Sequence, residues 1–201
     1  MAIEGKYVWA GFDAEQRVEH FRFEGSDRVQ IHRREQGSVW LFDLRFNEAD
    51  WKLAYLEILK TADGRETTAR YRWDDGAWVG EIAASGERRE VCIPMASELE
   101  IVIPIPAFEG QFLRRVALPV LSQRRVETVA IDLGDLSAAQ SHCIIERLAD
   151  GTRDVNGAKA RAAAYRWTDE FGAQEFVWIN QANVALGRAD RFEGALRYWL
   201  S

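Results

Sequence analysis

The 201-residue sequence contains few of the residues and runs that mark several common protein classes. It has four prolines, two cysteines and three histidines, so a Pro-rich, collagen-like or disulfide-stapled chain is excluded. No apolar run approaches the roughly 18 residues of a membrane-spanning helix. The first residues also lack the basic segment followed by an apolar segment that marks an exported protein. We therefore expect a cytoplasmic protein without a transmembrane segment.

Short catalytic motifs are also missing. The sequence has no G-x-S-x-G, no phosphate-binding G-x-x-x-x-G-K-[ST], no G-x-G-x-x-G, no C-x-x-C and no H-E-x-x-H. The histidines His20, His32 and His142 are far apart and each is alone on its predicted strand. A metal site needs three or four converging ligands. We therefore expect no metal and no cofactor, and a non-enzymatic function rather than catalysis.

Charge and composition exclude two further classes. Thirty-two acidic and 26 basic residues give a net charge of −6, whereas nucleic-acid-binding proteins normally carry a basic surplus or stripe. With 47% hydrophobic residues the chain is not intrinsically disordered. Cys92 and Cys143 lie between apolar residues, and we expect both to be reduced thiols in the core. No linker divides the chain, so residues 1–201 are expected to form a single domain.

Apolar residues alternate with a period of two along most of the chain, which is typical of strands. Trp40, Phe42 and Leu44 fall on one face of the segment 38–46, and Asp43 falls on the other. Asp-Gly and Asn-Gly pairs separate such segments at short intervals and favour tight hairpins. The other predicted strands are 6–12, 17–24, 28–34, 51–60, 66–73, 77–83, 88–93, 98–104, 126–133, 138–147, 158–167, 174–181, 184–189 and 194–200.

One region has helical spacing instead. All four prolines fall between Pro94 and Pro119, and Phe108, Phe112 and Val116 recur between them at intervals of four. This spacing predicts a helix over 109–118. Residues 136–148 can be read either as a strand or as a helix capped by a serine, and we favour the strand. The predicted fold is thus mainly β, a many-stranded antiparallel sheet with a single helix.

Several carboxylates lie on strands beside apolar or aromatic residues. An acid on an apolar face must be paired, protonated or directed into a wet cavity. Such acids can converge in an acidic pocket with aromatic walls that suits sugar hydroxyls, or each can pair with an arginine on an exposed face. Of the eight tryptophans, Trp51 and Trp78 are candidates to line a cavity. The acids concerned are Glu19, Asp43, Glu57, Glu98 and Glu100.

The segment 51–60 is apolar on both faces. Trp51, Leu53 and Tyr55 alternate with Leu56 and Ile58, so both faces need to be covered. A single predicted helix cannot cover every aromatic face, and monomers rarely expose large apolar patches. We therefore expect a homodimer.

The order of short motifs along nearly the whole chain resembles that of a bacterial family named for proposed glycolipid binding. The motifs that carry the resemblance are Val18-Glu19-His20, Asp50-Trp51, Asp75-Gly76-Ala77-Trp78, Glu98-Leu99-Glu100-Ile101 before Pro104, Leu113-Arg114-Arg115-Val116, Tyr165-Arg166-Trp167 and Phe176-Val177-Trp178-Ile179-Asn180. The resemblance implies a spiral β-roll, in which a long antiparallel sheet wraps around a single helix and the protein forms a tight dimer. It also implies binding of a lipid or glycolipid, in glycolipid or cell-envelope metabolism.

On such a roll the acid-bearing strands come together. We therefore predict one acidic ligand pocket, braced by arginine, whose members are Glu19, Asp43, Glu57, Glu98, Glu100, Trp51, Arg114 and Arg115. Two other functions stay open. One is a glycoside hydrolase that uses two carboxylates as acid and base. The other is a structural homodimer without a ligand.

Overall fold

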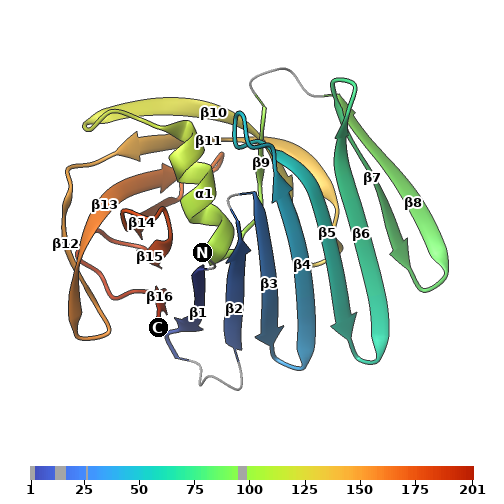
Figure 1. Ribbon diagram of the computed structural model, residues 1–201, viewed down its shortest axis with the longest axis horizontal. Helices are drawn as coiled ribbons and strands as arrows, with labels where there is room; N and C mark the ends of the chain where they lie inside the picture. The colour runs from blue at the N-terminus through green and yellow to red at the C-terminus, as the bar shows by residue number, and fades with distance from the viewer. Residues whose placement is uncertain (1–2, 12–16, 26, 95–98) are drawn as a thin grey trace.

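The strands follow one another around a single long sheet in this computed structural model, which describes residues 3–11, 17–25, 27–94 and 99–201 (Figure 1). The hydrogen-bonded order is β8-β7-β6-β5-β4-β3-β2-β1-β16-β15-β14-β13-β11-β10-β9, and β12 pairs with β13. The elements are β1 Ile3–Trp9, β2 Arg17–Glu24, β3 Arg28–Glu35, β4 Ser38–Phe46, β5 Leu53–Ala62, β6 Arg65–Asp74, β7 Ala77–Ala84, β8 Glu87–Pro94, β9 Glu100–Val102, α1 Pro106–Val116, β10 Ser122–Ile131, β11 Ala138–Arg147, β12 Gly151–Val155, β13 Ala158–Thr168, β14 Gln174–Ile179, β15 Ala185–Ala189 and β16 Tyr198–Leu200.

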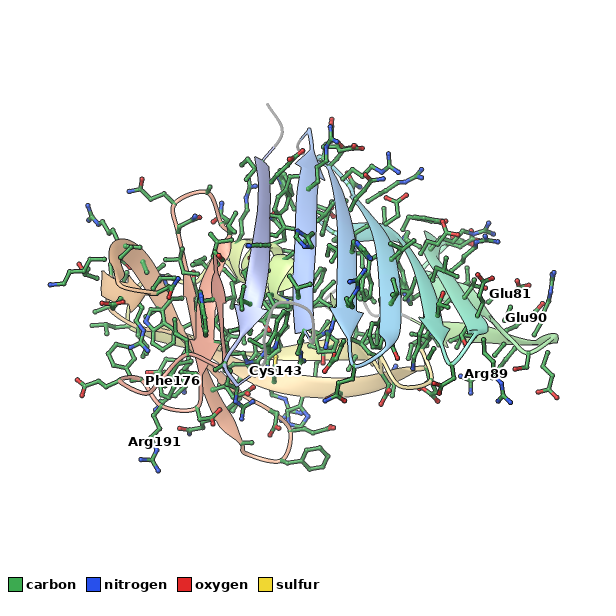
Figure 2. All side chains as sticks on the ribbon, turned by 90° about the horizontal axis from the view of Figure 1, so that it is seen from below. Glu81, Arg89, Glu90, Cys143, Phe176 and Arg191 are labelled. Atoms are coloured by element: carbon green, nitrogen blue, oxygen red, sulfur yellow. The ribbon has the colours of Figure 1, made fainter. Side chains whose placement is uncertain are left out.

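The sheet wraps around α1. Figures 1 and 2 show the helix between the half formed by β1–β8 and the half formed by β10–β16. Nine of its eleven residues are buried, because strands surround it on nearly every side. Phe108 stacks on Phe46 of β4 at 6.2 Å between ring centroids, and Phe112 meets Trp167 of β13 at 5.0 Å. The predicted architecture, a sheet wrapped around a helix, is therefore confirmed.

Most strands lie where the alternation predicts them. The bounds of β2, β4 and β11 agree with the sequence, and residues 138–147 are a strand rather than a helix. The strand β12 was not predicted. It has only five residues, and the turn pairs Asp150-Gly151 and Asn156-Gly157 lie at its two ends. Neighbouring strands are antiparallel apart from β9, which pairs with β10 in parallel.

The helix begins and ends earlier than the predicted 109–118. Pro106 is its first residue rather than a boundary outside it, because the first turn of a helix does not use the backbone N–H that proline lacks. The helix ends at Val116, and Ala117 takes a left-handed conformation with φ of 46°.

The strand predicted over 51–60 is β5, which begins two residues later, at Leu53. Trp51 has a φ of 58° and lies in the turn before β5, so it does not continue the strand face. The pairing of β4 with β5 shifts by one residue between Arg45 and Phe46, and Leu53 therefore faces the core. Tyr55 and the alternate residues after it face outward. The common face predicted for Trp51, Leu53 and Tyr55 is thus wrong.

The two cysteines are free, but they lie in different environments. Cys143 is buried, and burial raises the pKa of its thiol to about 12. Cys92 is exposed on β8, the last strand on one side of the sheet, so its predicted place in the core is wrong. Within the described ranges no helix is long and apolar enough to cross a membrane.

Candidate functional site

The structure places the predicted carboxylates in three separate places. Glu19 lies inside the roll, Asp43 and Glu57 lie side by side on the outside, and Glu100 lies on β9. Glu98 lies outside the described residues. The predicted single pocket is therefore not formed, because strand parity sends the acids to opposite faces of the sheet.

Glu19 is completely buried beneath the first turn of α1. The residue before the helix, Ile105, has no side chain that can cap it, and Glu19 acts in its place. The backbone N–H of Ala107 donates to Oε1 of Glu19 at 3.2 Å, and a carboxylate is favourable at the positive end of a helix. Oε2 has no hydrogen-bond partner among the described residues. Burial raises the pKa of Glu19 to about 7, although Arg33 and the Ala107 N–H act against this.

We predict that Glu19 makes the protein less stable as the pH rises. Its pKa rises from 4.5 to about 7 on folding, so the folded state binds more protons than the unfolded chain between these values. Stability is then lost as the pH rises through 7. Glu19→Gln removes this dependence, and its free energy of unfolding relative to wild type should increase by about 3 kcal/mol between pH 4.5 and pH 8. Denaturant unfolding at several pH values measures this, and two parallel pH profiles would contradict it.

The sequence reasoning missed a second buried acid on α1. Glu109 is 4% exposed, and burial raises its pKa. Its carboxylate accepts hydrogen bonds from Arg188 of β15 and from the hydroxyl of Tyr198 of β16, and Arg188 also pairs with Glu175 of β14. This network ties the helix to the second half of the sheet. No motif in β14, β15 or β16 would have revealed that Arg188 and Tyr198 pair with Glu109.

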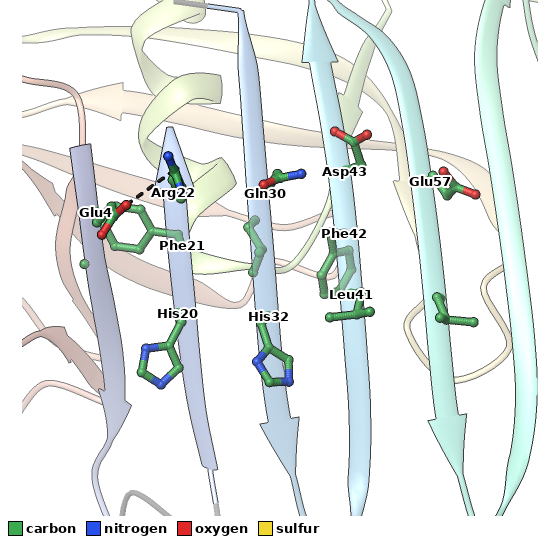
Figure 3. A pocket seen from close by; sticks show the side chains of 13 residues that line it. Glu4, His20, Phe21, Arg22, Gln30, His32, Leu41, Phe42, Asp43 and Glu57 are labelled. Carbon is green, nitrogen blue, oxygen red and sulfur yellow. Dashed lines mark ion pairs between the residues drawn. The ribbon is translucent and has the colours of Figure 1, made fainter. Parts of the chain in front are cut away.

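Asp43 and Glu57 line an outer groove, a hollow of about 640 Å³ on the outside of β1–β5 (Figure 3). The two acids are directly opposite on β4 and β5, and so are His20 and His32 on β2 and β3. The groove is lined by Glu4, Gly5, His20, Phe21, Arg22, Gln30, Ile31, His32, Leu41, Phe42, Asp43, Glu57 and Leu59. Its volume lies within the range of small-molecule sites, about 300–1,000 Å³.

Both acids of this groove form ion pairs with arginines. Arg28 donates to the two oxygens of Asp43 at 2.8 and 2.9 Å, and Arg45 adds a third contact at 3.1 Å. Partial burial raises the pKa of Asp43, but these hydrogen bonds outweigh burial and hold the pKa below its usual value. Glu57 accepts from Arg70 at 2.7 Å and from the hydroxyl of Tyr55 at 3.0 Å. Both acids thus fit the exposed ion-pair alternative.

A second hollow, here called the seam cavity, lies where the edge strand β9 meets β5–β7. It has a volume of about 180 Å³, room for about six groups the size of water. It is lined by Asn47, Asp50, Lys52, Leu53, Ala54, Trp73, Trp78, Leu99, Glu100 and Ile101. A narrow extension shares Leu53, Glu100 and Ile101 with it and reaches Trp51 and the aromatic face of α1. The cavity therefore adjoins the interior of the roll.

Three of the predicted site residues, Trp51, Glu100 and Arg115, line this extension, and Arg114 contacts one of them. Glu100 forms an ion pair with Arg115 of α1, whose guanidinium also donates to the backbone oxygen of Asp50 at 2.9 Å. Arg114 lies over the ring of Trp51, with its guanidinium carbon 3.8 Å from the ring centroid. The double arginine of the helix thus reaches both Glu100 and Trp51.

Trp73 and Trp78 supply indole walls of the seam cavity. They are directly opposite each other on β6 and β7, across the Asp75-Gly76 turn. Trp78 was predicted to line a cavity, and it does. Trp73 was missed, although directly opposite residues of a hairpin share a face, so the turn alone could have paired the two indoles. No group of three or more potential metal ligands occurs among the described residues.

No family model and no curated protein matches the sequence. Solved structures with a similar fold include a DUF1089 family protein from Pseudomonas aeruginosa, with a TM-score of 0.64 and 18% identity over 94% of this chain and 98% of that chain. They also include a β-barrel-like protein of the domain of unknown function DUF1849 from Brucella abortus, with a TM-score of 0.55 and 6% identity over 100% of this chain and 94% of that chain. At these identities the likeness shows the fold alone.

Proposed function

We propose that this protein binds a lipid or glycolipid without transforming it, and that the seam cavity holds part of the ligand. One observation carries the proposal: a cavity with two indole walls and further apolar lining opens at the unclosed side of the sheet, with polar groups and a carboxylate–guanidinium pair at its edge. Apolar walls suit an acyl chain, and aromatic walls with a few polar groups are usual in ligand sites. The resemblance in motif order agrees with such a ligand.

The polar edge supports recognition of hydroxyl groups. Glu100 and Arg115 are each 15% exposed, so both reach solvent while they remain paired. A carboxylate accepts hydrogen bonds and a guanidinium donates them, which lets one pair bind neighbouring hydroxyls of a sugar. The hollow is too small for a complete lipid, so we assign to it the first part of the chain and the adjoining headgroup.

Hydrolysis is the less favoured alternative. A glycoside hydrolase of the usual kind needs one carboxyl group that gives a proton and a second carboxylate on the other side of the scissile bond. Asp43 is held ionised by two guanidinium groups, and Glu57 already accepts two hydrogen bonds. Glu19, whose pKa is about 7, is 0% exposed and out of reach of a substrate. These positions favour binding over catalysis.

We predict that filling the seam cavity weakens binding of octyl β-glucoside, a small amphiphile with a sugar head. Ala54 lines the cavity from β5, and Ala54→Phe should lower the affinity at least tenfold, about the effect of one blocked apolar contact surface. Glu100→Gln should lower it by about tenfold through one lost charged hydrogen bond. Calorimetric titration below the critical micelle concentration measures both, and native mass spectrometry of gently purified protein shows any retained lipid.

The matched control is Ala83→Phe, which adds the same side chain to β7 at a residue that does not line the cavity. It should bind like wild type. Equal affinity of Ala54→Phe and Ala83→Phe would contradict the assigned site. Release of glucose from the probe would instead support the hydrolase, and absence of both binding and a retained lipid would support a structural protein.

Self-association belongs to the same proposal. Phe192 is 45% exposed, and its ring lies 5.7 Å from that of Phe176 and 5.9 Å from that of Trp178, so apolar surface remains accessible beside β14. We keep the homodimer as a proposal on this ground.

A further inference from the structure

The outer groove has two ends of different chemistry. Its basic end consists of His20 and His32 on β2 and β3, with Lys6 of β1 and Arg34 of β3 beside them just outside the lining, and its apolar end consists of Leu41 and Leu59 on β4 and β5. Lys6, His20, His32, Leu41 and Leu59 are successive directly opposite partners across the five strands. They therefore share the outer face, and Figure 3 shows the two imidazoles side by side.

Positive charge at the basic end is not neutralised by the residues that the structure describes. None of the four side chains forms an ion pair with a described residue. The acids on the same face of β1 and β2, Glu4 and Glu24, are both paired with Arg22 instead. Glu4 lies 3.3 Å and Glu24 lies 3.5 Å from the guanidinium of Arg22. The pKa of His20 is lowered, first by burial and then by His32, Lys6 and Arg34, which places these cations around it.

The sequence run His32-Arg33-Arg34 splits between the two faces of β3. Arg33 points into the roll, where it lies over the rings of Trp9 and Trp40 at 5.5 Å from each centroid. Its neighbours on either side remain on the outer face. A short basic cluster that was expected on a solvated strand face or turn flank therefore contributes His32 to the groove and places Arg34 beside it.

We propose that the outer groove binds an anionic amphiphile, with its acidic group at the basic end and its apolar part over the apolar end. The groove has about 640 Å³, enough for such a molecule. From β2 to β5 there are three strand spacings, about 14 Å, so the ligand must be that long to reach both ends. Asp43 and Glu57 flank the apolar end, and each is paired with an arginine. This end therefore suits the apolar tail of the ligand rather than a second acidic group.

The site is separate from the seam cavity and does not depend on it. Binding should tighten as the pH falls, because an imidazole that gains a proton becomes an attractive partner for an anion. The groups that face His20 are Lys6 and Glu4 from β1, Arg22 from its own strand, and His32 and Arg34 from β3. Among these residue types, histidine is the one whose charge changes between mildly acidic and neutral pH.

Decanesulfonate is a suitable probe, because its charge is constant over this pH range. Nuclear magnetic resonance titration of the full chain, below the critical micelle concentration, should shift the amides of β2–β5 at about pH 5.5. The combined variant His20→Gln/His32→Gln should bind about tenfold more weakly, and wild type should weaken several-fold at pH 8. His142→Gln on β11, in the other half of the sheet, is the matched control and should bind like wild type.

Four results would overturn the proposal. Equal binding by the double-histidine variant and the control would exclude the basic end. If inorganic phosphate binds as tightly as decanesulfonate, the groove is an anion site to which the apolar part adds nothing. If octyl β-glucoside shifts the same amides with the affinity of decanesulfonate, the groove is an apolar site to which the charge adds nothing. If decanesulfonate binds only after dilution has dissociated a dimer, the groove is covered by a second copy of the chain.

Discussion

Replacing Gly110 by alanine is expected to destabilise the protein by about 3 kcal/mol or more, although alanine is the better helix former by about 1 kcal/mol. Gly110 lies in the middle of α1, where the helix backbone packs directly on the chain between β14 and β15. A Cβ there would overlap the carbonyl oxygen of Asn183 and lie 2.9 Å from its carbonyl carbon and 3.1 Å from the backbone nitrogen of Ala185. Backbone atoms cannot rotate away as a side chain can, so the helix itself must shift.

The matched control for Gly110→Ala is Gly151→Ala. Gly151 begins β12, its added Cβ meets no atom within 4 Å, and its φ is not in the left-handed region. This control should stay within about 0.5 kcal/mol of wild type. Thermal and denaturant unfolding measure both variants. If Gly110→Ala is as stable as the control, the close backbone contact between α1 and the strand connection does not exist.

Arg188→Met should cost about 3–5 kcal/mol of unfolding free energy, because it leaves a buried carboxylate without its cation. Arg188 is 18% exposed at its side chain, and it pairs with both Glu109 on α1 and Glu175 on β14. Methionine keeps most of the apolar packing against Trp167. Lowering the pH should reduce the cost, since a proton then neutralises Glu109.

A double variant separates the lost charge partner from lost packing. Arg188→Met combined with Glu109→Gln removes the unpaired buried charge and keeps an acceptor for the Tyr198 hydroxyl. It should be more stable than Arg188→Met alone by about 1–3 kcal/mol. Arg125→Met is the control, because Arg125 and its partner Glu127 are both more than half exposed. Additive costs in the double variant would show that the ion pair contributes little.

The strands could be predicted because their signal is local. In β4, Trp40 and Phe42 face the core and Asp43 faces outward, as the period-two alternation predicts. The same alternation placed Glu19 on the inner face of β2 beside Phe21. Where a local signal is broken, prediction failed: the left-handed turn at Trp51 and the shifted pairing after Arg45 changed the parity of β5.

The candidate sites depend on contacts between residues far apart in sequence. Arg115 meets Glu100 only because α1 passes behind β9, and Trp73 faces the same cavity only because β6 and β7 lie opposite that edge. Sequence motifs named Trp51, Glu100 and the double arginine, but no pattern in the sequence tells which of them share a cavity. The acids Asp43 and Glu57 were placed in the same set, and they lie on the outer face instead.

The sequence by itself determined the class of fold, most strand positions, the presence of one helix and, for most strands, the face on which the apolar residues lie, because alternation, turn pairs and helical spacing act over a few residues. Tertiary structure alone decided how the sheet closes around α1, and therefore which side chains meet. The buried cap that Glu19 forms on Ala107 joins residues 88 positions apart. The curvature of the sheet and the register shift before β5 set such meetings, and neither is marked by the alternation or the turn pairs of the sequence.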